Sequence, residues 1–382
     1  MIYLDNSATT KPYKEVLSSF ITINEKHFGN PSSLHEMGTT ASLLLEKARE
    51  QAALILGVKS DEMIFTSGGT ESNNSAIKGI AEANRYKGRH IITTDIEHPS
   101  VYNTVKELET KGFRVSFLKV NQEGIISLEE LKRLLTSETI LVSIMHVNNE
   151  VGSIQPIQEA GKIIKEKSKA VFHVDAIQSF GKVPILIENS SIDSLSLSAH
   201  KFHGMKGNGL LYMKKNLLFT PQLSGGSQER GIRSGTENVG GAVSTAKAMR
   251  MTMENMHSQN LNQHRSRLVH FFASRPEVKL VSPQQEGAPH IVNVTVPGLK
   301  GEVIVHALEQ EGIFISTTSA CSSKKAQISK TILAMGFSEK DARGSVRISM
   351  SHLTEPAEID RLLEAWRKVI PPLLKGIKRN EV

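Results

Sequence analysis

Short apolar runs typical of β-strands alternate with amphipathic helical stretches through the first two-thirds of this 382-residue chain. Between the runs, apolar residues recur at helical spacing, as at Val101, Val105 and Leu108. Parallel strands need a crossover connection, so the alternation favours an α/β fold with a mostly parallel sheet and helices on both faces. The predicted strands are residues 63–66, 90–94, 114–119, 140–146, 171–175, 194–198 and 210–213. Ser127, followed by Glu130, predicts a capping box at the start of a helix.

The pattern changes from about Gly240. Met249, Met253 and Met256 recur at helical spacing and predict a connecting helix in which the methionines serve packing. Strand-like runs at 290–296, 313–317 and 346–350 and a helix at 303–310 then predict a smaller α+β unit. We expect a large domain at residues 13–255 and a small C-terminal domain at residues 256–382, which residues 1–12 join.

Composition and charge set limits on the class of protein. Hydrophobic residues make up 39% and charged residues 22% of the chain, as in ordinary globular proteins. The apolar runs are too short to span a membrane, and the first residues lack a secretory pattern, so we expect a cytoplasmic protein. The net charge of +7 reflects either a solvated surface or a basic patch for an acidic partner or RNA.

Cys321 is the single cysteine of the chain. One cysteine excludes an internal disulfide and a multi-thiolate metal site, and we expect no metal. Taken by itself, a lone cysteine is usually a buried and inert small hydrophobe.

A glycine-rich turn follows the first of the strands in the main series. Residues 67–72 read Ser-Gly-Gly-Thr-Glu-Ser between a predicted strand and a helix, so main-chain N–H groups, the helix N-terminus and the Thr70 hydroxyl could all face a phosphate. The segment matches neither the P-loop nor the dinucleotide fingerprint. A glycine-rich turn with nothing bound is the alternative.

Three further strand ends carry polar residues suited to an aldehyde cofactor. Lys201, beside Ser198 and His200, offers an amine for a Schiff base next to phosphate donors. Asp175 ends an apolar strand, where a carboxylate could keep a pyridine nitrogen protonated, and His98 could stack on the ring. A surface lysine, a strand-end turn and a helix start are the respective alternatives, but four such signals at successive strand ends indicate pyridoxal 5'-phosphate.

These residues lie in segments that resemble the cysteine desulfurases, a branch of the class V aminotransferases within the fold-type I pyridoxal-phosphate enzymes. The matching segments run in family order over nearly the whole chain: YLDNSATT (3–10), GNPSSLHEMG (29–38), FTSGGTESNN (65–74), EHPS (97–100), MHVNNEVGSIQPI (145–157), FHVDAIQS (172–179), SLSAHKFHGMKG (196–207), ERGIRSGTENV (229–239), SACSS (319–323) and VRISMS (346–351). The spacing from Cys321 to Gly336 is similar to that of the subgroup with a longer catalytic loop.

The resemblance implies a role for each matched position. It implies that Lys201 forms the Schiff base, that His98 stacks on the ring and moves protons, and that Cys321 receives sulfur from L-cysteine as a persulfide while L-alanine leaves. The implied phosphate ligands are Gly69, Thr70, Ser198, His200 and, from the other subunit of a homodimer, Thr236. Further implied contacts are those of Asp175 to the ring nitrogen, Gln178 to the ring hydroxyl, Asn149 to ring and substrate, and Arg347 to the substrate carboxylate.

Arg347 also has support from periodicity. Val346, Ile348 and Met350 share one face of a predicted strand, so Arg347 points the other way, and its guanidinium suits two-point binding of a carboxylate. A surface arginine is the alternative.

The sequence departs from the family at two places. Met205 stands where relatives usually have proline, and Lys324 and Lys325 follow the cysteine where relatives often have another pattern. These two lysines could lower the pKa of the thiol, or they could simply be solvated. We expect a sulfur acceptor in tRNA thiolation or in iron–sulfur cluster assembly, and favour tRNA thiolation because the extended tail of scaffold-docking relatives is missing. Another class V reaction (an aminotransferase or a selenocysteine lyase) and a catalytically inactive RNA-binding module remain the alternatives.

Overall fold

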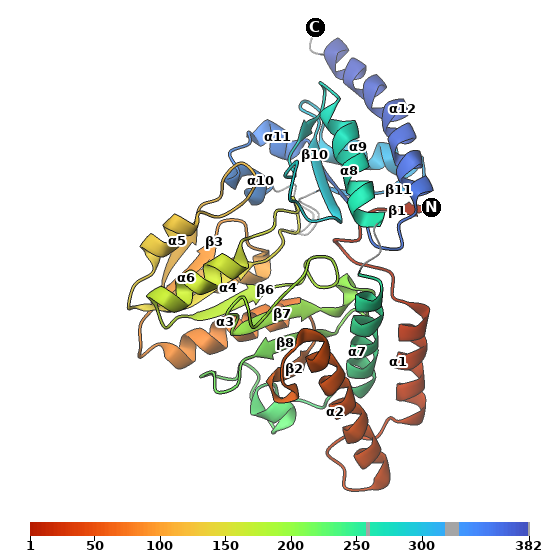
Figure 1. The fold of residues 1–382 in the computed structure, drawn as a ribbon. Coiled ribbons are helices and arrows are strands. Elements are labelled where there is room, and N and C mark those ends of the chain that lie inside the picture. Colours follow the sequence, from red (N-terminus) through yellow and green to blue (C-terminus); the bar gives the residue numbers. More distant parts are fainter. Residues whose placement is uncertain (257–259, 318–327, 381–382) are drawn as a thin grey trace.

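The computed structural model describes residues 1–256, 260–317 and 328–380, and its largest sheet has seven strands (Figure 1). In sheet order the strands are β2 (Met63–Thr66), β8 (Gly209–Met213), β7 (Ser194–Ser198), β6 (Val171–Asp175), β5 (Thr139–Met145), β3 (His90–Thr94) and β4 (Arg114–Leu118). The five strands from β7 to β4 pair in parallel, whereas β8 is antiparallel to β7 and to β2. The predicted α/β architecture is confirmed, and each predicted strand is matched to within one residue.

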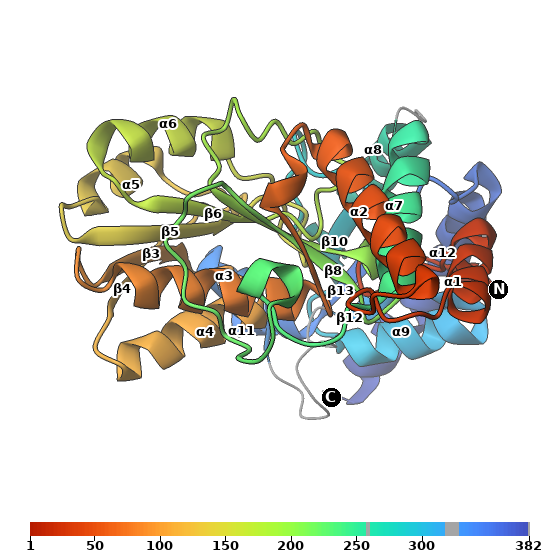
Figure 2. The same ribbon diagram turned by 90° about the horizontal axis from the view of Figure 1, so that it is seen from below.

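Helices cover both faces of this sheet (Figure 2). Ile91 and Ile92 point to opposite faces, as neighbours in a strand must. Ile91 packs in a cluster with Ile77 and Val105, whereas Ile92 packs in a cluster with Leu131. The first face carries α3 (Gly69–Asn84) and α4 (Pro99–Thr110), and the second carries α5 (Leu128–Leu134) and α6 (Ile157–Lys167). Coverage of both faces explains why these strands are apolar runs.

Three helices pack together beside the sheet: α1 (Lys14–Lys26), α2 (Glu36–Leu56) and α7 (Val239–Glu254). The predicted connecting helix is α7. Met249 is fully buried in the core of the large sheet, and Met253 packs against it. The helix ends at Glu254, so Met256 lies just beyond it.

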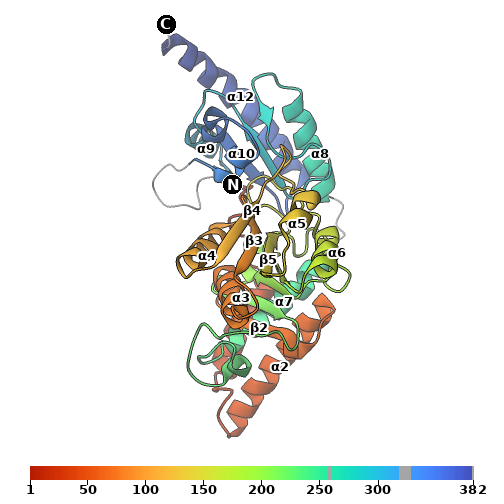
Figure 3. The same cartoon turned by 90° about the vertical axis from the view of Figure 1, so that its left-hand side faces the viewer.

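A second hydrophobic core surrounds a smaller antiparallel sheet, which Figure 3 shows above the large sheet. Phe272 and Trp366 are fully buried in this core, and so is Leu4 from the N-terminal segment. The sheet order is β12 (Ser316–Thr317), β13 (Ser345–Ser349), β10 (Ile291–Thr295) and β9 (Lys279–Leu280), and the helices are α8 (Asn260–Ala273), α9 (Gly301–Gln310), α10 (Lys330–Ala334), α11 (Glu339–Arg343) and α12 (Pro356–Asn380). The separate cores support our proposal of two domains at 13–255 and 256–382, with residues 1–12 in the second.

Two local predictions are wrong. The predicted strand 313–317 is two short strands in different sheets, because β11 (Ile313–Phe314) pairs with the N-terminal β1 (Ile2–Tyr3) while β12 pairs with β13. The capping box of α5 is also only half formed. Ser127 accepts a hydrogen bond from the Glu130 N–H at 3.2 Å, but the Glu130 carboxylate accepts from the Lys119 N–H instead.

No helix within residues 1–256, 260–317 and 328–380 has both the length and the apolar character that crossing a lipid bilayer requires.

A buried ion pair joins α2 to the loop that precedes α7. Arg49 and Glu229 are 3% and 6% exposed, and their side chains pair through two contacts of 2.6 and 2.9 Å. Glu229 also accepts a hydrogen bond from the Phe65 N–H, next to the glycine-rich turn. Removal of one partner would leave the other charge buried and unpaired, which is costly.

We therefore predict that Arg49→Met lowers the free energy of unfolding by about 3–5 kcal/mol, because Glu229 keeps its buried charge. Arg250→Met is the matched control, because Arg250 forms an exposed pair with Glu254, and we expect a change of about 1 kcal/mol or less. Urea unfolding of both variants measures the difference. Equal losses in the two variants would contradict the role of the buried pair.

Candidate active site

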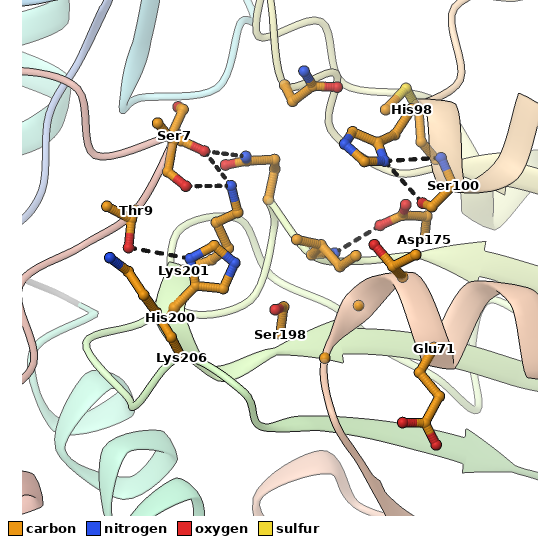
Figure 4. Close-up of a pocket in the computed structure, with 18 of the residues that line it drawn as sticks. Ser7, Thr9, Glu71, His98, Ser100, Asp175, Ser198, His200, Lys201 and Lys206 are labelled. Atoms are coloured by element: carbon orange, nitrogen blue, oxygen red, sulfur yellow. Dashed lines mark hydrogen bonds between the residues drawn. The ribbon is translucent and has the colours of Figure 1, made fainter. Parts of the chain in front are cut away.

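A cavity of about 610 Å³ opens where the carboxyl ends of β3, β5, β6 and β7 meet. Ligands of open α/β sheets bind at this edge, and the volume suits a cofactor together with a small substrate. In Figure 4, His98, Ser100 and Asp175 lie on one side of the cavity, and Ser7, Thr9, His200, Lys201 and Lys206 on the other.

The predicted phosphate cradle lines one end of the cavity. It combines the turn at Gly68–Gly69 with Ser198 at the end of β7. A Cβ atom at Gly69 would lie 2.2 Å from a side-chain atom of Ile177, and a Cβ atom at Gly209 would lie 2.6 Å from the main chain of Gly68. Glycine at both positions thus lets the turn sit between β8 and the loop after β6. The N-cap residue of α3 is Gly68, and no side chain of the described residues forms a capping hydrogen bond there, so the first N–H groups of the helix suit an anion.

Asp175 ends β6 with its carboxylate inside the protein. Asn73, fully buried on α3, donates to one carboxylate oxygen at 2.7 Å, and the Ile177 N–H donates to the other at 3.0 Å. Burial raises the pKa of Asp175, while the neighbouring His98 and Lys201 act in the opposite direction. A cationic ring nitrogen at this carboxylate would compensate for burial of the negative charge.

His98 serves as the N-cap of α4. Its Nδ1 accepts a hydrogen bond from the Ser100 N–H at 3.1 Å and lies 2.8 Å from the Ser100 hydroxyl. A main-chain N–H can only donate, so Nδ1 is the acceptor and the hydrogen of the neutral ring is on Nε2. Burial, more than the charge of Lys201, lowers the pKa of His98, which keeps the ring neutral.

Lys201 follows β7 in a short helical turn, η2 (Ala199–Lys201). Its amine donates hydrogen bonds to the main-chain carbonyls of Ser7 and Ala8, the second at 2.9 Å. Gln178 donates to the same Ser7 carbonyl at 2.9 Å, while its buried Oε1 has no hydrogen-bond partner among the described residues. His200 contacts the Thr9 hydroxyl at 3.2 Å, and burial lowers the pKa of this histidine to about 4.

Arg347 reaches the cavity from β13 of the smaller sheet. It is 1% exposed and donates to the Asn149 carbonyl at 2.8 Å and to the Asp5 carboxylate at 2.9 Å. Val346, Ile348 and Met350 point into the second core, so the predicted orientation of Arg347 is confirmed.

The cavity brings together nearly all the residues that the sequence singled out: Gly69, Thr70, His98, Asn149, Asp175, Gln178, Ser198, His200, Lys201 and Arg347. Thr236 instead lines a neighbouring cavity, which shares Ser67 and Gly207 with the first. Cys321 lies outside the described residues.

Sequence reasoning missed the residues that support the site. Ser7 and Ala8 accept from Lys201, Asp5 pairs with Arg347, and Asn73 holds Asp175. Residues 5, 7 and 8 fall in the matching segment YLDNSATT, and residue 73 falls in FTSGGTESNN. The family match thus marked both segments, but the sequence did not indicate what these positions do.

Comparison with known proteins decides the family. The model of the class V aminotransferases matches residues 2–362. The chain belongs to the class V aminotransferase family.

Within this family the chain is similar to proteins named for sulfur chemistry. It is 44% identical over 374 residues to the cysteine desulfurase IscS of Clostridium botulinum, covering 97% of this chain and 94% of the relative. It is likewise 44% identical over 373 residues to a NifS/IcsS protein homolog of Lactobacillus delbrueckii, covering 97% of both. A solved NifS-like protein superimposes with a TM-score of 0.91 at 39% identity, covering 97% of this chain and 99% of that one. The structure of SspA in complex with cysteine gives 0.80 at 35% identity, with 92% and 99% covered.

The cofactor of this family member is pyridoxal 5'-phosphate, and the residues present fit it. The uncapped start of α3 suits the phosphate, the buried Asp175 suits a protonated ring nitrogen, and the amine of Lys201 suits the aldehyde. The buried Gln178 Oε1 without a described partner fits a polar substituent of the ring.

Glu97, next to His98, is a buried acid behind the cavity. Its Oε1 accepts hydrogen bonds from the Thr94 hydroxyl at 2.8 Å and from the Met145 N–H at 2.9 Å, whereas Oε2 has no partner among the described residues. Burial, with the negative charge of Asp175 as a smaller cause, raises the pKa of Glu97 to about 8. The folded protein therefore holds a proton on Glu97 that the unfolded chain releases at lower pH.

We predict that the free energy of unfolding falls as pH rises from about 4.5 to about 8, because the folded protein keeps this proton on Glu97 while the unfolded chain releases it. Glu97 contributes up to about 1.4 kcal/mol per pH unit to this decline. Glu97→Gln cannot titrate and should flatten the decline. Urea unfolding across this pH range compares the variant with wild type and with Glu138→Gln, an exposed control. A Glu97→Gln slope equal to that of wild type would refute the assignment.

Proposed function

We propose that this protein is a cysteine desulfurase, which converts L-cysteine into L-alanine and a persulfide on Cys321. The observation that carries the proposal is the convergence of Lys201, Asp175 and Arg347 on one cavity, in a chain that is 44% identical to named cysteine desulfurases over nearly its full length. An amine, a buried carboxylate and a carboxylate-binding guanidinium are the groups that a pyridoxal-phosphate enzyme needs for an amino acid substrate.

L-Cysteine is supported as the substrate by the site and by a relative. Arg347 provides a guanidinium for the α-carboxylate, with Asn149 beside it. SspA, whose structure contains cysteine, is 35% identical to this chain and superimposes over 92% of it.

Each of the cavity residues has a distinct role in the proposed reaction. Pyridoxal 5'-phosphate, when bound, supplies an electron sink for the negative charge that develops at the substrate Cα. Asp175 keeps the ring nitrogen protonated, and Lys201 removes the proton from Cα. His98, which carries its ring hydrogen on Nε2, moves the proton at the substrate thiol. Arg347 fixes the orientation of the substrate.

Cys321 accepts the sulfur in this proposal. Its thiolate attacks the substrate sulfur, so that an S–S bond forms, the Cβ–S bond breaks and the bonding electrons remain with the carbon. Cβ takes up a proton, L-alanine leaves, and Cys321 retains Cys–S–SH. The requirement for a reduced thiol fits the cytoplasm, which keeps thiols reduced.

A homodimer and a sulfur acceptor complete the proposal. Thr236 lines a cavity that adjoins the phosphate cradle through Ser67 and Gly207, and we propose that it reaches the phosphate of the other subunit. We propose an acceptor in tRNA thiolation or in iron–sulfur cluster assembly, and the net charge of +7 favours tRNA thiolation. Desulfurase assays with labelled cysteine and candidate acceptors distinguish the two.

We predict that Cys321→Ser lowers persulfide formation from L-cysteine by at least about 100-fold while the visible absorption of the bound cofactor is kept, because the nucleophile is lost but Lys201 is not. Lys201→Ala should abolish that absorption. Alanine release and the mass of the protein after incubation with cysteine measure the outcome.

The same variants separate the alternatives. An aminotransferase would retain amino transfer in Cys321→Ser, and a selenocysteine lyase would retain release of selenium from selenocysteine. A wild-type protein without visible absorption that binds RNA tightly would instead support an inactive binding module.

We predict that two inactive homodimers, Lys201→Ala and Thr236→Ala, regain activity when their subunits are mixed. In a mixed dimer one site combines both defects, while the other has an intact Lys201 and receives an intact Thr236 from its partner. Co-expression with two different tags isolates the mixed dimer, which should show about half of the wild-type activity per dimer. A mixed dimer no more active than the two parents would contradict a shared site.

A further inference from the structure

An ion pair joins the glycine-rich turn of the cavity to the segment that carries Thr236. Glu71, in the first turn of α3, accepts a hydrogen bond at 2.9 Å from the Nε–H of Arg233. The two side chains are 15% and 27% exposed. Glu71 lines the main cavity, whereas Arg233 lines the neighbouring cavity together with Thr236. Neither partner of this ion pair has a role in the reaction proposed above.

The Glu71 carboxylate is held from two sides. Its other oxygen, Oε2, accepts a hydrogen bond from the Ser67 N–H at 2.8 Å, within the glycine-rich turn itself. In Figure 4 the side chain extends from the start of α3 away from Lys201. Burial acts to raise the pKa of Glu71, but the hydrogen bonds from Arg233 and Ser67 outweigh it, so the pKa lies below its usual range. Both partners of the pair are therefore charged at neutral pH.

A second carboxylate attaches the same segment to the other end of the turn. Glu229 is buried, pairs with Arg49 and accepts a hydrogen bond from the Phe65 N–H at 2.9 Å. Its φ of +45° is left-handed, a costly conformation for a residue with a side chain, and such a residue persists only where surrounding contacts hold it. Because Phe65 precedes the glycine-rich turn and Glu71 follows it, the segment 229–233 is fastened on both sides of the turn.

Thr236 depends on this attachment for its position. It follows Arg233 by three residues, which span at most about 11 Å, and its side chain is exposed on the single subunit. Gly235, between the two, has a φ of +116° and donates its N–H to Gln228 Oε1 at 3.2 Å. A hydroxyl that binds a phosphate outside its own subunit binds it more tightly when its segment is already ordered, because less conformational freedom is lost on binding.

We propose that Glu71 and Arg233 are positioning residues for the cofactor phosphate of the other subunit: their ion pair fixes the segment that carries Thr236 against the glycine-rich turn of its own subunit. The turn thus serves its own site directly and the site of the partner subunit through this ion pair. The inference rests on the proposed function, because it assumes a homodimer in which Thr236 crosses between subunits.

The test uses full-length mixed dimers in which only one subunit keeps Lys201, so that only one site can form the Schiff base. The second subunit carries Lys201→Ala, and two different tags isolate the mixed dimer. In the trans dimer, Glu71→Gln stands in the Lys201→Ala subunit, which supplies Thr236 to the intact site. In the cis dimer, Glu71→Gln stands in the subunit that keeps Lys201. Titration of the cofactor-free dimers with pyridoxal 5'-phosphate, followed by visible absorption, gives the dissociation constant.

The variants isolate the ion pair from other effects. Glu71→Gln keeps an acceptor for the Ser67 N–H but has no charge for Arg233. Arg233→Met in the trans position removes the other partner. Arg133→Met in the same position is the matched control, because it removes an exposed ion pair with Glu130 on α5. The reference is the mixed dimer of wild type and Lys201→Ala, and thermal unfolding verifies that each dimer is folded.

We predict that the dissociation constant of pyridoxal 5'-phosphate rises about tenfold in the trans dimer, because Thr236 then loses a hydrogen bond to a charged phosphate. It should not rise in the cis dimer, whose intact site receives Thr236 from an unaltered segment. Arg233→Met in the trans position should act like Glu71→Gln, and the Arg133→Met control should match the reference. With pyridoxal, which lacks the phosphate, the trans dimer should match the reference as well.

A trans dimer equal to the reference, or an equal rise in the trans and cis dimers, would overturn the proposal. Thr236→Ala in the trans position separates this failure from failure of the shared site. If Thr236→Ala weakens the binding of pyridoxal 5'-phosphate and Glu71→Gln does not, only the positioning role is wrong. If neither weakens it, Thr236 does not cross between subunits, and the proposed shared site is wrong together with the positioning role.

Discussion

Burial of a carboxylate at the carboxyl end of β6 costs free energy unless a positive charge or hydrogen bonds oppose it. Asn73 and the Ile177 N–H contribute two hydrogen bonds to Asp175, and neither carries a charge. His98 and Lys201 reduce the remaining electrostatic cost of the carboxylate, and a protonated pyridine ring against Asp175 would reduce it further.

The cost of burying a charge also applies to the positive groups of the cavity. Arg347 is almost fully buried and is balanced by Asp5, so its charge is stable at the substrate end. At the other side, the carbonyl oxygens of Ser7 and Ala8 accept hydrogen bonds from the Lys201 amine, and the Lys201 carbonyl accepts one from Lys182.

The N-terminal segment connects the two hydrophobic cores through the site. Leu4 is buried in the second core, Asp5 pairs with Arg347 from the smaller sheet, and Ser7 accepts from Lys201 at the edge of the large sheet. The Ser7 N–H also bonds the Ser349 hydroxyl at 2.9 Å. A change in the packing of the second core would therefore alter the position of the groups that contact the Lys201 amine at the edge of the large sheet.

The sequence by itself determined the α/β alternation, the strands of the large sheet and most of the residues that line the cavity, because local periodicity and polar strand ends are properties of short segments. It could not separate β11 from β12, because their partner strands lie in different parts of the chain. It also could not show that the Glu130 carboxylate accepts a hydrogen bond from the Lys119 N–H and not from the Ser127 N–H. Tertiary structure alone decided that Ser7, Asn73, Glu97 and Lys182 surround the catalytic groups. These are long-range contacts, and a shift of a pKa by burial arises only after distant segments have been packed together.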